Sequence, residues 1–249
     1  MRFTLSTVTT FVVSVFVVSI STNAHVEAAH LYVDNHLGSD RNDGVTREVI
    51  GVRTGPVRSI TRALQLARAS DIIVITNTGV PYYDHLTLSG ARLSGSELGP
   101  LRILGNGATL TGARPLPPSA WREVDLDLWK IVPFRKGHYQ LIRDGQAVPE
   151  LETAPGSAAR TLPAIPVGQW CAFRGAIYYQ AERLAEPSKQ KFAIAGLECG
   201  ITVFAAHDIH IADLKVQHFR LDGVNVHDLG RNIVLQNVSC VENGRAGIA

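Results

Sequence analysis

The feature that most constrains the fold is an internal repeat near the end of the 249-residue chain. Residues 207–216 align with residues 231–240 at an offset of 24, and the match continues from Gly223 to Gly247. The apolar positions coincide in four pairs: Ile209 with Ile233, Ile211 with Leu235, Leu214 with Val238, and Val216 with Cys240. Short alternating strands repeated every 20 to 30 residues or so are typical of a parallel β solenoid, in which each turn of the chain buries its inward side chains on the next.

Turn-forming residues also coincide in this repeat, because Asp208 and Asp213 align with Asn232 and Asn237. Asp and Asn tolerate the left-handed backbone conformation, so these positions are predicted corners of the solenoid. A corner resets the alternation of inward and outward side chains. The direction of each polar side chain around it therefore stays open.

The first 29 residues have the features of an export signal. Arg2 supplies a positive start, residues 11–20 are apolar, and small residues follow at Ala24, Ala28 and Ala29. The apolar run is shorter than the roughly 20 residues that a membrane helix needs. We therefore expect a secreted or periplasmic protein without a membrane span after signal cleavage, with an uncleaved N-terminal anchor as the alternative.

Charge and cysteine content limit the class of partner. The formal net charge is only +2, so no broad basic field attracts nucleic acid, and any site for an acidic substrate must be local. An odd set of three cysteines is unusual in an exported protein. A Cys171–Cys199 bridge remains open, whereas Cys240 is expected to be a small buried hydrophobe stacked on Val216.

We expect an N-terminal cap and the first solenoid rungs over residues 30–112. The pattern of residues 56–69 predicts a helix with Pro56 in its first turn. Three short apolar runs, residues 72–75, 85–88 and 101–104, predict strands, and residues 105–107 predict a corner. The helix has an apolar face to bury, so it is assigned to cover the open end of the solenoid core.

Residues 113–200 break this pattern and predict a small β-rich insertion, because they are rich in proline and aromatic residues. Asp144-Gly145 predicts the turn of a hairpin spanning residues 141–148. The solenoid resumes over residues 201–249. Since a solenoid that ends at Ala249 would leave an unpaired strand edge, we expect these rungs to be truncated from a longer protein.

The sequence resembles the pectate lyase-like superfamily of right-handed parallel β-helix proteins, in its bacterial secreted branch. The resemblance rests on residues 32–34 with 38–44, on residues 58–63 followed by Asp71 and by Tyr82-Tyr83, and on the repeats after residue 201. Residues 69–71, Ala-Ser-Asp, depart from the Pro-Gly-Asp usual before the first strand. The resemblance implies an all-β right-handed parallel β-helix and, since many relatives act on polysaccharides, a monomer that binds polysaccharide.

A first candidate site is an acidic loop near the N-terminus. Its oxygen-bearing side chains are spaced as calcium ligands often are: Asp34, Asp40, Asn42 and Asp43. The loop lacks the bidentate glutamate that ends a regular calcium loop. Turns held by side-chain to backbone hydrogen bonds are therefore the alternative to a Ca²⁺ site.

A second candidate site is the polar surface of the last rungs, with solvated rung surface as the alternative. In an eliminating enzyme, Lys215 or Arg220 would be the base and His218 or His227 an acid or sugar contact. Asp222 or Asp228 would bind a cation or act as general acid, and in a glycoside hydrolase these two would be the carboxylate pair. Aromatic residues of the insertion form its own core or stack on sugar rings: Trp121, Trp129, Trp170, Tyr178 and Tyr179.

The sequence thus predicts a secreted carbohydrate-active enzyme, a polysaccharide lyase ahead of a glycoside hydrolase, with Ca²⁺ as the expected cofactor if there is one. The alternative is a non-catalytic β-helix that serves as a surface, adhesion or carbohydrate-binding protein. No phosphate-binding glycine loop, zinc-ligand spacing or nucleophile elbow is present.

Overall fold

The computed structural model describes residues 28–152 and 160–249, and the predicted all-β class is confirmed. The predicted export signal lies almost wholly outside the described residues. Within the described part no helix is long and apolar enough to cross a membrane. Beside the strands, the described residues form one α-helix, and three short 3₁₀ helices lie at Ala91–Leu93, Pro118–Ala120 and Pro187–Lys189.

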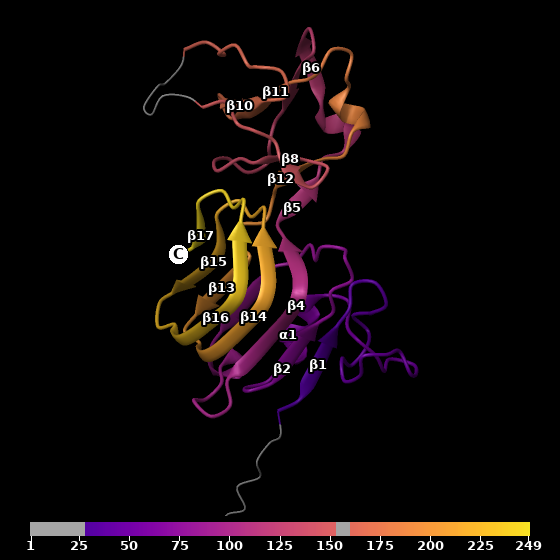
Figure 1. Cartoon of the computed structure of the whole chain (residues 1–249), viewed down its shortest axis with the longest axis vertical. Coiled ribbons are helices and arrows are strands. Elements are labelled where there is room, and N and C mark those ends of the chain that lie inside the picture. The colour runs from indigo at the N-terminus through magenta and orange to yellow at the C-terminus, as the bar shows by residue number, and fades with distance from the viewer. Residues whose placement is uncertain (1–27, 153–159) are drawn as a thin grey trace, which may run out of the picture.

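Two parallel sheets form the lower body in Figure 1. The first has the order β1-β2-β4-β14-β16, and the second has the order β17-β15-β13-β3. The strands of the first sheet are β1 (His30–Val33), β2 (Ile72–Ile75), β4 (Leu101–Thr111), β14 (His207–Gln217) and β16 (Arg231–Val241). Those of the second are β3 (Leu86–Ser89), β13 (Ile201–Phe204), β15 (Asp222–His227) and β17 (Ala246–Ile248). From β13 to β17, successive strands alternate between the two sheets.

The predicted 24-residue register is confirmed by the pairing of β14 with β16. The four apolar pairs of the alignment, Ile209 with Ile233 through Val216 with Cys240, are cross-strand partners. The corners also coincide, since Asn232 donates to Asp208 over 2.9 Å and Asn237 donates to Asp213 over 3.0 Å. These four corner residues have φ between 52° and 54°, the left-handed region predicted for them.

The corner at Asp213 explains which side chains of β14 face inward. Ile209 and Ile211 are buried before the corner, Leu214 and Val216 after it, so the inward parity changes at Asp213. These side chains join one apolar core between the two sheets. Burying a side chain of this size contributes about 1.5 to 3 kcal/mol, so the stacked columns are the main source of stability.

The helix is shorter than predicted, because α1 spans only Ile60–Leu66. Ser59 is its N-cap and accepts a hydrogen bond from the Arg62 amide. Val57 is extended instead of helical, since its backbone is hydrogen bonded to β1. The predicted apolar face is nevertheless correct, and its residues join the core: Val57, Ile60, Ala63, Leu64 and Ala67.

The predicted corner at residues 105–107 is a bend inside β4 rather than a break between strands. Asn106 and Gly107 have φ of 51° and 79°, and β4 continues on both sides. The pairing with β14 shifts register here, because Leu104 faces Ala212 whereas Ala108 faces Leu214. Two extra residues are thus accommodated without loss of the strand.

Residues 113–200, hereafter the insertion, lie at the upper end of the parallel sheets in Figure 1 and form two antiparallel sheets. Their orders are β10-β11-β7-β6 and β5-β12-β8-β9. The first contains β6 (Arg122–Asp125), β7 (Leu128–Ile131), β10 (Trp170–Phe173) and β11 (Ala176–Gln180). The second contains β5 (Ala113–Pro115), β8 (Leu141–Arg143), β9 (Gln146–Ala147) and β12 (Phe192–Ala195).

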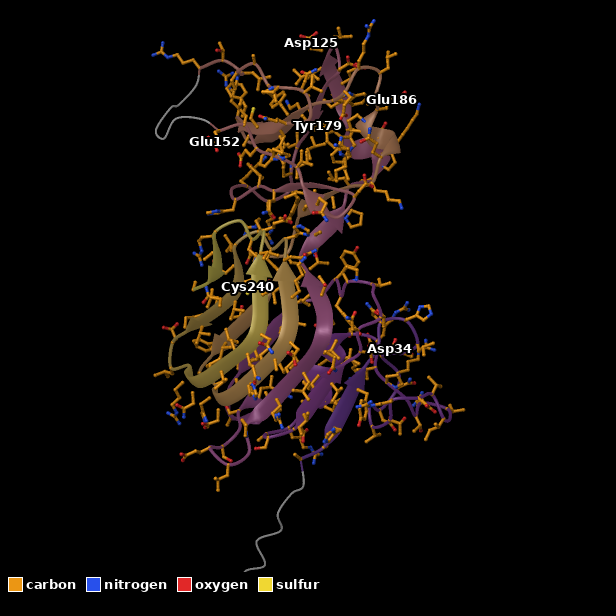
Figure 2. The ribbon with its side chains drawn as sticks, viewed as in Figure 1. Asp34, Asp125, Glu152, Tyr179, Glu186 and Cys240 are labelled. Atoms are coloured by element: carbon orange, nitrogen blue, oxygen red, sulfur yellow. The ribbon has the colours of Figure 1, made fainter. Side chains whose placement is uncertain are left out.

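The insertion has an apolar core of its own. Trp121, Trp170 and Tyr179 are buried in it, and Trp129 packs against it, as the core alternative predicted. Tyr179, labelled in Figure 2, lies among these side chains, whereas Cys240 lies on β16 of the lower body. The predicted hairpin is confirmed, since β8 pairs with β9 and the turn residues Asp144 and Gly145 have positive φ.

Candidate functional site

The six residues predicted for the rung site do not come together. Lys215 is exposed on β14, beside a shallow groove in the first parallel sheet lined also by Asp213, Asn237 and Ser239. His227 and Asp228 lie at the end of β15, where the carboxylate is 3.1 Å from the imidazole Nδ1. Lys215 and this pair thus lie on different sheets.

Asp222 and Asp228 do not form the carboxylate pair that hydrolysis requires. They lie at opposite ends of β15, and at about 3.3 Å per residue their backbones are roughly 20 Å apart. His218 is buried as well, with its Nε2 2.6 Å from a carboxylate oxygen of Glu242. The structure therefore gives His218 a contact with the protein instead of an open surface.

Asp222 is fully buried at the start of β15 and is surrounded by donors. Arg245 donates to both carboxylate oxygens, and the Asn225 amide donates to Oδ2 over 2.8 Å. The hydrogen bonds from Arg245 lower the pKa of Asp222, and burial opposes them. Cys199 Sγ lies 3.8 Å from the same Oδ2.

The three cysteines are free, so the open Cys171–Cys199 bridge is not formed. Cys171 is buried inside the insertion, whereas Cys199 lies between the insertion and β13. Cys240 packs half-buried against the apolar core beside Val216, in the register predicted for it.

In the acidic N-terminal loop, the first two candidate ligands accept backbone hydrogen bonds. Asp34 is buried, and its Oδ1 accepts from the amides of His36 and Leu37, each over 2.8 Å. Asp40 Oδ1 accepts from the amides of Arg58 and Ser59 over 2.9 and 2.8 Å. These bonds connect the loop to the segment that leads into α1.

The other two residues of this loop are also bound to backbone. The Asn42 amide donates to the Pro56 carbonyl over 2.9 Å, and Asp43 Oδ1 accepts from Val45 over 3.2 Å. No group of three or more His, Cys, Asp or Glu residues suited to a metal occurs in the described part of the chain. The contacts are those of the turn alternative, and a Ca²⁺ site here stays a prediction.

A cleft of about 650 Å³ lies between the second parallel sheet and the insertion, and we call it the insertion cleft. Thr87 and Thr202, cross-strand neighbours on β3 and β13, line it from the parallel sheet. Its polar and charged lining residues are His85, Thr87, Arg114, Arg135, Glu198, Cys199, Thr202 and Arg220. Its apolar lining residues are Leu116, Ala120, Ile131, Val132, Pro133, Phe134, Tyr139, Ile194, Ala195 and Leu197.

Contacts between the insertion and the rungs fix the walls of this cleft. The amides of Gly196 and Leu197 both donate to the Gly112 carbonyl, over 2.9 and 3.1 Å, where the chain leaves and re-enters the rungs. Farther along, Arg220 Nη1 lies 3.4 Å from the Lys136 carbonyl. These bonds hold the loop after β7 against the segment that follows β14.

Arg220 is the one predicted catalytic residue that lines the insertion cleft. Its Nη2 donates to Glu198 Oε1 over 2.7 Å, and its side chain is only 12% exposed. Its Nε is buried without a hydrogen-bond partner in the described part of the chain. Asp222 lies close to this ion pair, because residues 198–200 and 221–222 pair as two strands do. The Glu198 carbonyl accepts a hydrogen bond from the Leu221 amide, and the Asp222 carbonyl accepts one from the Gly200 amide.

Sequence reasoning missed Arg114, Phe134, Arg135 and Glu198, because they come from an insertion whose path no repeat predicts. A signal existed only for Glu198. Gly200 lies against Gly223 as Gly223 lies against Gly247. Extending the sequence repeat backwards with an offset of 23 instead of 24 residues therefore places Glu198 beside the last strands.

No protein-family model and no curated protein matches the chain. Among solved structures it is similar to XylC in complex with xylose, at 13% identity and a TM-score of 0.53, over 86% of this chain and 43% of that one. It is also similar to a glycoside hydrolase at 14% identity and a TM-score of 0.53, over 77% and 51%. The chain thus spans about half the length of these structures, and the likeness shows a shared fold.

Proposed function

We propose that this protein is an exported, carbohydrate-active member of the pectate lyase-like superfamily and that it binds extracellular polysaccharide in the insertion cleft. The alternation of strands between two parallel sheets supports a right-handed parallel β-helix with α1 as its N-terminal cap. Similarity of fold to a xylose-bound protein and to a glycoside hydrolase supports a carbohydrate ligand. The export signal predicted from the sequence of residues 1–29 supports an extracellular polymer.

The observation that carries the proposal is the composition of the insertion cleft. Ligand sites combine apolar and aromatic walls with a few polar groups that fix orientation, and this cleft has both. Phe134 is 93% exposed at the cleft, and the Arg135 guanidinium lies 5.6 Å from its ring. An exposed aromatic ring beside hydrogen-bond donors suits a sugar, which has an apolar face and a rim of hydroxyls.

The reaction proposed is polysaccharide cleavage, by elimination or by hydrolysis. Hydrolysis uses two carboxylates, of which Glu198 lines the cleft while Asp222 lies behind it with Arg245. Elimination uses a base near the sugar C–H and an acid at the leaving oxygen, and the cleft offers His85 as a candidate base and the Tyr139 hydroxyl as a candidate acid. A non-catalytic polysaccharide-binding protein is the rival, and it requires only the walls of the cleft.

The proposal is tested with the full chain and a panel of neutral and acidic polysaccharides, with and without a calcium chelator. Reducing ends indicate cleavage, and ultraviolet absorbance of unsaturated ends distinguishes elimination from hydrolysis. Loss of either product with chelator would support the predicted Ca²⁺ requirement. Retention on a polysaccharide gel without product would favour the non-catalytic rival, and neither binding nor product would overturn the proposal.

The place of binding is tested by Phe134→Ala, with Leu126→Ala as the matched control. Leu126 is 80% exposed and lies in the insertion outside the cleft lining. Loss of a stacking ring is worth about 0.5 to 1.5 kcal/mol, so we expect affinity for the retained polysaccharide to fall by a factor of about 2 to 13. Equal affinity of the two variants would place the sugar elsewhere.

A further inference from the structure

We infer that the saccharide in the insertion cleft is acidic, and that Arg114, Arg135 and Arg220 form the site for its carboxylate. Glu198 is then the internal counter-ion that Arg220 holds while the site is empty of sugar. This inference rests on the proposed function, because it specifies the ligand of the same cleft.

The charge of the cleft lining is the first argument. Three arginines line it against one glutamate, in a chain whose formal net charge is only +2. Within the described part of the chain, neither Arg114 nor Arg135 forms a salt bridge, whereas Arg220 pairs with Glu198. Guanidinium groups that line one cleft and outnumber the protein anions there attract an anionic ligand.

The packing of Arg114 is the second argument. Arg114 lies on β5, and a Cβ added at Gly196 would come within 2.6 Å of its Cγ and Cδ. The absence of a side chain at Gly196 thus leaves the space in which the arginine stem lies. Arg114 thus packs against Gly196, which also lines the cleft.

Arg220 supplies the third argument. Its side chain is 88% buried, since only 12% is exposed, so its position is fixed by the surrounding protein. Its protein partners are one carboxylate oxygen of Glu198 and the 3.4 Å contact to the Lys136 carbonyl. The Nε of Arg220 is buried, and these contacts use one donor each of Nη1 and Nη2, so one N–H on each Nη remains for a ligand.

The exposure of Glu198 makes it a replaceable partner. Its side chain is 59% exposed, so water solvates its carboxylate when it leaves the more buried Arg220. A sugar carboxylate entering the cleft meets Arg220 with Glu198 in competition. Arginine binds carboxylates through paired N–H donors, so the sugar carboxylate gains a directed contact as well as charge.

The test compares binding of a hexuronate trisaccharide with that of its carboxyl-reduced neutral counterpart, by calorimetry on the full chain. We expect the acidic sugar to bind at least about tenfold more tightly, and this preference to shrink as salt is raised, because exposed charges are screened. Inorganic phosphate at the same concentration is not expected to displace it.

The variants are Arg114→Gln and Arg135→Gln, with Arg183→Gln as the matched control, since Arg183 is exposed in the insertion outside the cleft. Each cleft variant is expected to weaken the acidic sugar about tenfold and the neutral sugar little. Glu198→Gln is expected to tighten the acidic sugar a few-fold, because it removes the competing carboxylate. All four positions are exposed, so the fold is expected to persist.

The outcomes separate the two proposals. Equal binding of both trisaccharides to the wild type would overturn the acidic-sugar inference and leave the proposed function standing. Binding of neither, together with silence on the polysaccharide panel, would overturn the proposed function as well. Displacement of the acidic trisaccharide by inorganic phosphate would show that the cleft binds anions in general and would overturn the acidic-sugar inference. Weaker binding of the acidic trisaccharide by Glu198→Gln would overturn the assignment of Glu198 as the counter-ion.

Discussion

The substitution Asp222→Asn tests the buried ion pair behind the insertion cleft. Asp222 is fully buried, and Arg245 donates its Nε to Oδ1 over 2.8 Å. Three donors converge on Oδ2: Arg245 Nη2, Asn225 Nδ2 and Cys199 Sγ. An asparagine replaces one oxygen by an NH₂ group, so in either orientation at least one donor faces a donor.

The magnitude follows from burial and exposure of the two partners. Removing one member of a buried pair costs about 3 to 5 kcal/mol. Hydrogen bonds to charged groups contribute about 1.5 to 3 kcal/mol. The Arg245 side chain is 49% exposed and regains water when its partner is neutral, which offsets part of the loss. We therefore expect the free energy of unfolding to fall by about 3 kcal/mol in Asp222→Asn.

Urea unfolding over a range of pH measures this loss and its cause. The pKa of Asp222 is lowered in the folded state, so its contribution is complete above the unfolded value of about 3.9 and disappears as pH falls through the folded value. The difference between wild type and variant should therefore be constant near neutral pH and shrink below about pH 4. Asp228→Asn, at an exposed position, is the control. A loss below about 1 kcal/mol near neutral pH, or one equal to the control, would show that the pair does not stabilise the rungs.

Two further substitutions test the stacking of the rungs and the burial of a tyrosine. Gly223→Ala should lower the free energy of unfolding by about 1 to 3 kcal/mol, because its Cβ would lie 2.7 Å from the Gly247 carbonyl oxygen. Gly51→Ala, whose nearest neighbour is at 3.8 Å, should change it little in the same urea titration. Burial raises the pKa of Tyr82 to about 12, so its stabilising effect is complete below about pH 10 and is lost as pH rises through about 12. Tyr82→Phe should therefore cost about 1 kcal/mol at neutral pH and remove one late step from the spectrophotometric phenol titration; no change in that titration would contradict the assignment.

The rungs could be predicted from sequence because their stability is local and periodic. Ile211 pairs with Leu235, and Asp213 with Asn237, because stacking places equivalent residues of successive turns in contact. The alignment of residues 207–216 with residues 231–240 therefore identified pairs of residues that are cross-strand partners in the structure. The helix prediction failed at both ends of α1: capping by Ser59 and the backbone bonds of Val57 determine its start, and the extended backbone of Ala67 ends it.

The site could not be predicted in the same way, because its residues come from segments without a repeat. Arg114 and Arg135 belong to the insertion and Arg220 to the segment after β14, and they line one cleft because the insertion lies over the second parallel sheet. A cluster of polar residues along the sequence, from Lys215 to Asp228, is divided by the rungs between two sheets and the buried interior. Where successive strands alternate between two sheets, proximity in sequence at spacings shorter than one repeat is a poor guide to proximity in space.

Hydrogen exchange with and without a saturating hexuronate trisaccharide tests most directly whether the insertion cleft is the binding site. The account predicts slower exchange of backbone amides in residues 131–139 and 194–202, which supply most of the lining residues of the cleft, and unchanged exchange in β1 and β2. Protection confined to the outer face of β14 and β16, around Lys215, would contradict it and place the sugar on the first parallel sheet.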